Sequence, residues 1–280
     1  MTNPLVSTDW LADHLADPGL VILDASWHMP AAGRDPRAEY VQQHIPGAVF
    51  FDIDGVSDHA SGLPHMLPSP PEFATAARRL GVEPGSKIVV YDSVGVFSAP
   101  RVWWSFRAMG HADVAVLDGG LRRWLEELRP VEAGWREPAH GEFKAHARPG
   151  LVRDLAQVRD ALERRSAQVV DARSPARFRG DEPEPRAGLR AGHMPGARNV
   201  PWSALVEADG ALAGPARLRA VFEAAGVNLE EPIVTTCGSG ISASILALGL
   251  ARLGREDVAV YDGSWSEWGA QADTPVATGP

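Results

Sequence analysis

The sequence predicts an α/β protein made of two tandem copies of one domain, each a mainly parallel sheet flanked by helices. Three matches between the halves, in the same order and at a nearly constant offset, support this prediction. Residues 21–25 resemble 169–173, residues 44–48 resemble 193–197, and residues 113–120 resemble 257–264. We expect domain boundaries at 1–130 and 150–280, joined by a linker over 131–149, a stretch with several Pro and Gly and little apolar periodicity.

Within each copy, short apolar runs alternate with longer amphipathic stretches. The expected strands are 20–24, 49–51, 88–91 and 114–117 in the first copy, and 169–171, 233–236 and 258–261 in the second. The expected helices are 73–80, 99–109 and 121–128, followed by 155–164, 216–225 and 241–253. Strands separated by helices predict parallel sheets that are covered on both faces. Ligands of such sheets bind at the carboxyl ends of the strands.

Composition excludes several classes of function. The 280 residues carry 27 basic and 36 acidic side chains, a net charge of -9, which argues against a general nucleic-acid binder and against a membrane surface. A single cysteine cannot form an internal disulfide, and no secretory signal or membrane-spanning run is visible. We therefore expect a cytoplasmic protein with no nucleic-acid or membrane partner.

That cysteine, Cys237, lies in the string Cys-Gly-Ser-Gly-Ile-Ser, between an expected strand and an expected helix. Backbone N–H groups converge at such a loop and stabilise a thiolate. A lone cysteine is also often a small buried apolar residue. Gly238 and Gly240 favour a reactive loop, because a strand cysteine that only packs in a core needs no glycine beside it. Aligning the copies on Ser98 and Ser242 puts Ser93 opposite Cys237, so we expect chemistry in the second copy alone.

With the double repeat and this loop, the chain resembles the two-domain rhodanese-type sulfurtransferases over nearly its whole length. Its loop is similar to that of the members that use 3-mercaptopyruvate, whereas members that use thiosulfate carry Cys-Arg-Lys-Gly. The resemblance implies two tandem rhodanese-like domains, the first without the catalytic cysteine. It also implies an enzyme that needs no cofactor and moves sulfur through a Cys237 persulfide to a thiol or cyanide, with release of pyruvate. A reduced thioredoxin or a small thiol is the implied acceptor.

The resemblance also implies site residues. Arg177 and Arg186, nine residues apart, match two arginines that hold the carboxylate of mercaptopyruvate. Backbone groups of the loop, from Gly238 through Gly240, Ile241 and Ser242, would cradle the sulfur and the substrate.

For catalysis, the resemblance implies that Cys237 is the nucleophile and that Ser239, His65 and Asp54 form a proton relay. The first domain would lend His65 and Asp54 to the loop of the second. From the residues alone, Asp54 is better explained as a turn cap and His65 as a loop histidine than as catalytic groups.

Alternatives are a thiosulfate:cyanide sulfurtransferase, a cysteine phosphatase and a non-catalytic binding module. Two uncharged loop residues, Gly238 and Ser239, disfavour the first, because a dianion needs cations. A phosphatase needs an arginine about six residues after the cysteine, where this chain has Ala243. The retained thiol and arginines disfavour the third, and the scattered histidines offer no metal site.

Several residues fit structural roles better. We expect Arg179, Arg190 and Arg198 on a solvated rim and Trp27 in packing. His44 and His193 belong to a repeated His-x-Pro-Gly-Ala turn, so a role in the fold is favoured for both.

Overall fold

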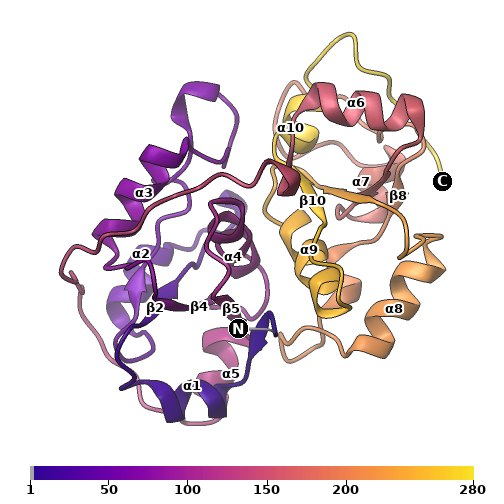
Figure 1. The fold of residues 1–280 in the computed structure, drawn as a ribbon. Coiled ribbons are helices and arrows are strands. Elements are labelled where there is room, and N and C mark those ends of the chain that lie inside the picture. The colour runs from indigo at the N-terminus through magenta and orange to yellow at the C-terminus, as the bar shows by residue number, and fades with distance from the viewer. Residues whose placement is uncertain (1–2) are drawn as a thin grey trace. The chain divides into compact units, whose positions relative to one another are not determined.

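Alternating strands and helices organise the chain into two sheets of the same design (Figure 1). The computed structural model describes residues 3–280, so the first two residues of the predicted 1–130 domain lie outside it. Two compact units result: the first holds residues 3–57, 68–148 and 207–212, and the second holds 58–67, 149–206 and 213–280. The domain boundaries predicted from the sequence stay a prediction. No helix among residues 3–280 is long and apolar enough to cross a membrane.

The first unit contains a five-stranded sheet in the order β1-β5-β4-β2-β3, with every pair parallel. Its strands are β1 Leu5–Val6, β2 Leu20–Asp24, β3 Val49–Phe50, β4 Lys87–Tyr91 and β5 Val114–Leu117. Its helices are α1 Thr8–His14, α2 Pro36–Gln42, α3 Pro70–Arg79, α4 Ala99–Ala108 and α5 Gly120–Glu126, with a 3₁₀ turn η1 at Pro30–Ala32.

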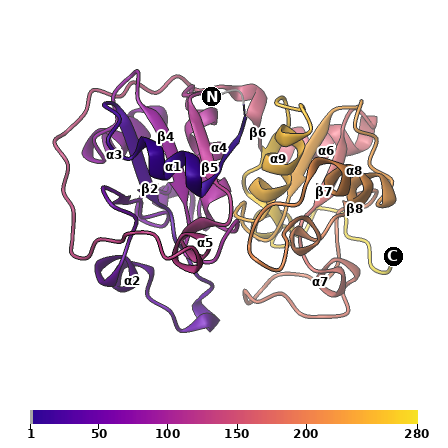
Figure 2. The same cartoon turned by 90° about the horizontal axis from the view of Figure 1, so that it is seen from below.

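The second unit repeats this plan, with the order β6-β10-β9-β7-β8 and parallel pairing throughout. Its strands are β6 Val152–Arg153, β7 Gln168–Asp171, β8 Arg198–Asn199, β9 Ile233–Thr236 and β10 Ala259–Tyr261. Its helices are α6 Leu155–Arg164, α7 Pro175–Arg179, α8 Pro215–Ala224, α9 Ala243–Arg252 and α10 Ser264–Trp268. The 3₁₀ turns are η2 His59–Ser61, η3 Pro149–Leu151 and η4 Trp202–Leu205. Figure 2 shows the same elements from below.

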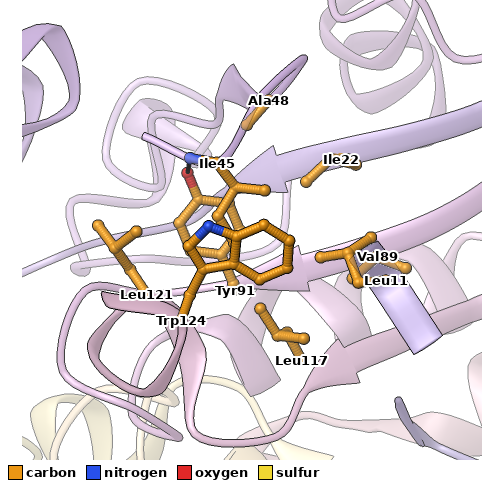
Figure 3. Packing of buried hydrophobic residues seen from close by; sticks show 9 residues of the cluster. All are labelled: Leu11, Ile22, Ile45, Ala48, Val89, Tyr91, Leu117, Leu121 and Trp124. Carbon is orange, nitrogen blue, oxygen red and sulfur yellow. Dashed lines mark hydrogen bonds between the residues drawn. The ribbon is translucent and has the colours of Figure 1, made fainter. Parts of the chain in front are cut away.

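In the first unit, one face of the sheet packs against α1 and α5. Tyr91 of β4 lies beside Trp124 of α5, and the backbone N–H of Ile45 donates to the Tyr91 hydroxyl at 3.3 Å (Figure 3). On the other face, Phe106 of α4 meets Phe73 of α3 edge to face, at 5.0 Å between ring centroids. The sheet is therefore buried on both faces, as expected for parallel strands.

The core of the second unit follows the same scheme. Val158 of α6 and two tryptophans of α10, Trp265 and Trp268, cover one face of β7, β9 and β10, while α9 packs on β9 and β10 and against α8. The predicted α/β class with two parallel sheets is thus confirmed. The predictions missed the two-residue strands β1, β6 and β8, which are too short to show a period of two. They also missed the short helices α1, α2, α7 and α10.

The repeated histidine turn has the same role in both units. His44 Nδ1 lies 2.8 Å from the carbonyl of Tyr40 and its ring stacks on that tyrosine. His193 Nδ1 lies 2.8 Å from the carbonyl of Phe178, and its ring stacks on Phe178 with 3.8 Å between centroids. Both imidazoles tie the turn to the preceding helix region, which confirms the structural role that the repeat predicts.

The two units differ in the partner of a buried aspartate at the end of their second strand. In the second unit Arg173 Nη2 donates to Asp171 Oδ2 at 2.7 Å. In the first unit residue 26 is a serine, and Asp24 accepts the N–H of Ser26 at 2.9 Å. Burial raises the pKa of Asp24 to about 6, although bonds with Ser26 and Tyr91 act in the opposite direction.

A raised carboxyl pKa in the folded state means that the contribution of Asp24 to stability is full in acid and is lost as pH rises through about 6. Asp24→Asn removes the carboxyl group, so the variant does not lose stability in this way. The free energy of unfolding of the variant minus that of the wild type should therefore increase by up to about 3 kcal/mol between about pH 4 and pH 7.5. Urea unfolding at both pH values measures it. A gain that is the same at both would contradict the prediction.

Candidate active site

Cys237 directly follows β9, and the loop that it opens leads into α9. Its thiol is the one free cysteine of the described residues and is buried. The N–H of Gly240 points at Sγ, at 3.2 Å. Gly240 has φ 83°, which is the left-handed region where glycine is unstrained. The loop therefore curls back on the sulfur and offers a backbone donor that stabilises an anion there.

The first turn of α10 holds the cysteine loop. Ser264 Oγ accepts the N–H of Cys237 at 3.2 Å, and Trp265 N–H donates to the Cys237 carbonyl at 2.9 Å. Ser266 donates to the carbonyl of Gly238 twice, from its N–H at 2.9 Å and from Oγ at 2.6 Å. Ser264 adopts φ 51° while fully buried, an unfavourable conformation for a residue with a Cβ. Sequence reasoning did not identify this clamp.

His65 belongs to the second unit, because the segment 58–67 packs there. Its Nδ1 lies 3.0 Å from Ser239 Oγ and 3.3 Å from the Ser239 carbonyl. The segment is fixed two residues later, where Leu67 N–H donates to Asp262 Oδ2 at 2.7 Å. His65 has φ 61°, so its backbone is held in a conformation that a loop without such anchors rarely adopts. The contact allows a proton to pass between the hydroxyl and the imidazole.

Arg177 and Arg186 both approach Gly238. A Cβ built on Gly238 would lie 3.0 Å from Arg177 Nη2 and 3.9 Å from Arg186 Nη1. Arg177 comes from α7, and Arg186 comes from the loop that follows this helix. Both guanidinium groups therefore lie next to the residue after the cysteine, where they can bind an anionic substrate.

Glu184 holds Arg177 in place. Arg177 donates from Nη2 to Glu184 Oε2 at 2.5 Å and from Nε to Oε1 at 3.3 Å. The carboxylate also receives Arg173 Nη1 at 2.8 Å. Sequence reasoning passed over Glu184, because two other acids, Asp181 and Glu182, stand beside it and nothing in the pattern singles it out.

Arg173 is fully buried behind this pair. It donates to both oxygens of Asp171, to the carbonyl of Gly192 and to Glu184, and it lies 4.2 Å over the ring of Trp265. Burial alone would lower the pKa of Arg173, but Asp171 and Glu184 raise it above the ordinary value. A signal was present in the repeat, since arginine stands at this position in the second copy and serine in the first.

The remaining predicted residues are distributed as follows. Ile241 is buried in the loop, and Ser242 stands at the N-terminal end of α9, where its carbonyl accepts Ile245 N–H at 3.1 Å. Asp54 belongs to the first unit, where Trp27 Nε1 donates to its Oδ2 at 3.1 Å. Trp27 thus packs, as expected, and also binds a predicted relay residue. The assigned roles of all these residues stay predictions.

The rim assignment was wrong for Arg190. Its guanidinium is partly buried and donates to the carbonyls of Trp268, Gln271 and Thr274, so it fixes the segment after α10. Arg198 is exposed, as expected, and the side chain of Arg179 is 40% exposed. Among residues 3–280, no group of three or more His, Cys, Asp or Glu side chains is arranged to hold a metal ion.

In the first unit Asp92, not Ser93, occupies the position of Cys237. Asp24 pairs with Tyr91 in the first sheet, and Asp171 pairs with Thr236 in the second, so the following residues correspond. The backbone agrees, because Leu121 N–H donates to the Asp92 carbonyl as Trp265 N–H does to that of Cys237. The alignment from sequence slipped by one because the first loop is one residue longer.

The side chain of Asp92 fills the loop of the first unit. Its Oδ1 accepts the N–H groups of Val94 and Gly95, at 3.1 and 3.0 Å. Its Oδ2 accepts those of three consecutive residues, Phe97, Ser98 and Ala99, at 2.8 to 2.9 Å. Burial raises the pKa of Asp92, while these five bonds favour the carboxylate. The two loops are thus one anion cradle with two different occupants.

Comparison with known proteins identifies the family. The model of the Rhodanese-like domain matches residues 7–127 and 154–271. The chain is 47% identical over 274 residues to the 3-mercaptopyruvate sulfurtransferase of Homo sapiens, covering 96% of this chain and 92% of that protein. It is 45% identical over 271 residues to the thiosulfate sulfurtransferase of Bos taurus, covering 94% and 91%.

Among solved structures, the crystal structure of SseA from Escherichia coli, described as a 3-mercaptopyruvate sulfotransferase, superposes with a TM-score of 0.87. It is 45% identical and covers 95% of this chain and 100% of that one. The chain belongs to the rhodanese family, with two rhodanese-like domains in tandem.

The cradle geometry predicts the effect of a side chain at Gly240. Gly240→Ala forces a Cβ into a left-handed conformation, which costs roughly 1–2 kcal/mol, and relaxation moves the N–H away from Sγ. We expect a lower melting temperature and several-fold slower alkylation of Cys237 by iodoacetamide near neutral pH. Gly214→Ala is the control, since Gly214 has φ −64° and open space around its Cβ. Equal alkylation rates in both variants would contradict the role of Gly240.

Proposed function

We propose that this protein is a 3-mercaptopyruvate sulfurtransferase that carries sulfur on Cys237. It would take sulfur from the small-molecule donor and pass it to a thiol or cyanide, with release of pyruvate. The observation that carries the proposal is the juxtaposition, within one unit, of a cradled thiol, two arginines beside Gly238 and a histidine on Ser239. Similarity to 3-mercaptopyruvate sulfurtransferases over nearly the full chain supports it.

The first half-reaction begins with the Cys237 thiolate, since the thiol is a poor nucleophile. Arg177 and Arg186 bind the carboxylate and keto oxygens of the donor, which brings the donor sulfur to Sγ. As the Sγ–S bond forms, the donor C–S bond breaks and its electron pair goes to carbon, giving the enolate of pyruvate. The arginines stabilise the charge that develops on the keto oxygen.

Ser239 and His65 would manage the proton. The donor thiol loses its proton as its sulfur joins Cys237, and the carbon left behind gains one to become the methyl group of pyruvate. Ser239 Oγ, in contact with His65 Nδ1 at 3.0 Å, is suited to relay that proton. Asp54 is the third member of this proposed relay. The Cys237 persulfide then remains in the loop.

The second half-reaction returns the cysteine to its starting form. An acceptor thiolate attacks the outer sulfur of the persulfide, forms a new S–S bond and releases the Cys237 thiolate. A reduced thioredoxin or a small thiol in the cytoplasm fits this step, and cyanide would give thiocyanate. Donor and acceptor react in turn, so the kinetics should be ping-pong.

A thiosulfate:cyanide sulfurtransferase is the second candidate, because the bovine thiosulfate sulfurtransferase is nearly as similar to this chain. Gly238 and Ser239 carry no charge, which favours mercaptopyruvate over thiosulfate as the sulfur donor. Thiosulfate carries two negative charges, and a loop without its own cations compensates them less well.

Steady-state kinetics with both donors tests the proposal. We expect kcat/KM for 3-mercaptopyruvate to be much higher than for thiosulfate with cyanide as the acceptor. Cys237→Ser should abolish turnover with either donor, because the sulfur has no carrier. Incubation with donor alone should add the mass of one sulfur atom to the wild type and none to the variant. Equal or reversed preference would reject the substrate, and turnover by Cys237→Ser would reject the mechanism.

The carboxylate clamp can be tested at Arg186. Arg186→Leu removes a charge-assisted hydrogen bond to the donor, which should raise KM for 3-mercaptopyruvate by about tenfold or more. Arg179→Leu is the control, because the side chain of Arg179 is 40% exposed and pairs with Asp181 at 2.7 Å. Unchanged kcat and KM in Arg186→Leu, or equal losses in both variants, would remove Arg186 from the site.

A further inference from the structure

Glu184 is the buried acid of an otherwise exposed acidic segment. Its side chain is 1% exposed, whereas Asp181, Glu182 and their neighbour Pro183 are exposed. The Glu184 carboxylate bridges two arginines, Arg173 on one side and Arg177 on the other. Burying a carboxylate is costly unless it is paired, so its position is set by these two cations.

The four groups form a chain of alternating charge. It runs from Asp171 through Arg173 and Glu184 to Arg177, with contacts of 2.7, 2.8 and 2.5 Å between nitrogen and oxygen. Two carboxylates balance two guanidinium groups. The Arg177 guanidinium, which lies next to Gly238, therefore already binds the Glu184 carboxylate through Nε and Nη2.

This compensation affects what the loop can bind. Arg177 Nη2 lies 3.0 Å from the Cβ position of Gly238, next to the nucleophile, and the Arg177 side chain is 22% exposed. Its planar fork can still donate hydrogen bonds to a carboxylate, because donation depends on N–H groups rather than on net charge. A dianion needs net positive charge as well as donors, and Glu184 removes one unit of it.

We propose that Glu184 is a specificity-determining residue, which lowers the positive charge beside Cys237 and so favours donors with one negative charge over dianions. The effect on sulfur donors rests on the proposed function. The effect of Glu184 on the local charge at Cys237 does not depend on sulfur transfer. Glu184 acts through Arg177 and is a positioning residue rather than a catalytic one.

Two alkylating reagents of similar size measure that charge directly. Iodoacetate is an anion and iodoacetamide is neutral, so the ratio of their rates with Cys237 reports the local potential. Glu184→Gln removes one negative charge at nearly constant shape and should raise this ratio about three- to tenfold. Glu182→Gln makes the same change on an exposed residue of the same segment and should leave the ratio unchanged.

Kinetics with the two sulfur donors is the second measurement. In Glu184→Gln, kcat/KM for thiosulfate relative to 3-mercaptopyruvate should rise by about tenfold, chiefly through a lower KM for thiosulfate. If the alkylation ratio rises while neither donor is used, the proposed function fails and the charge role stands. If a folded Glu184→Gln shows the wild-type alkylation ratio, the charge role is wrong.

Two further measurements test the charge role even if Glu184→Gln does not fold. Glu184→Asp keeps the charge with a shorter side chain, so its alkylation ratio should stay near that of the wild type, and a rise equal to that expected of glutamine would refute the charge role. In the wild type, acetate should protect Cys237 from iodoacetamide at least as well as sulfate at equal ionic strength. Markedly better protection by sulfate would overturn the proposal.

Discussion

Backbone N–H groups that converge at the end of a central strand require a hydrogen-bond acceptor, and each unit places one there. A parallel sheet followed by a helix leaves several donors in one loop, and an unpaired buried donor is unfavourable. In the first unit Asp92 supplies a carboxylate to five of them. In the second, the donor of Gly240 faces the sulfur of Cys237. One cradle thus holds a buried carboxylate in one copy and the thiol of the proposed nucleophile in the other.

The difference between the copies extends to the surrounding residues. The second copy holds its loop with side chains, since Ser264 and Ser266 form hydrogen bonds with the backbone of Cys237 and Gly238. The first copy has Gly120 where the second has Ser264, and a Cβ there would lie 2.3 Å from the Asp92 carbonyl. Arg173 likewise has Ser26 as its counterpart. A reactive loop therefore requires more support than one whose donors are already satisfied.

The sequence was sufficient to predict the fold class, the tandem repeat and most strands, because buried parallel strands are continuous apolar runs. From a recognisable loop and segment it also singled out Cys237, Arg177 and Arg186, and the structure places both arginines next to Gly238, the residue after the cysteine. The sequence was not sufficient for Glu184 or Ser266, because their contacts come from distant parts of the chain. The register error at Ser93 has a similar cause, since strand pairing, rather than residue identity, reveals the extra loop residue that makes Asp92 the counterpart.

The segment 58–67 lies in the first half of the sequence but packs in the second unit. Residues 207–212 lie in the second half but pack in the first unit. A single cut of the chain between the repeats would separate Ser239 from the imidazole of His65, which lies 3.0 Å away. Neither half of the sequence therefore contains a whole unit, and removal of the first half would also remove the segment 58–67 from the unit that holds Cys237.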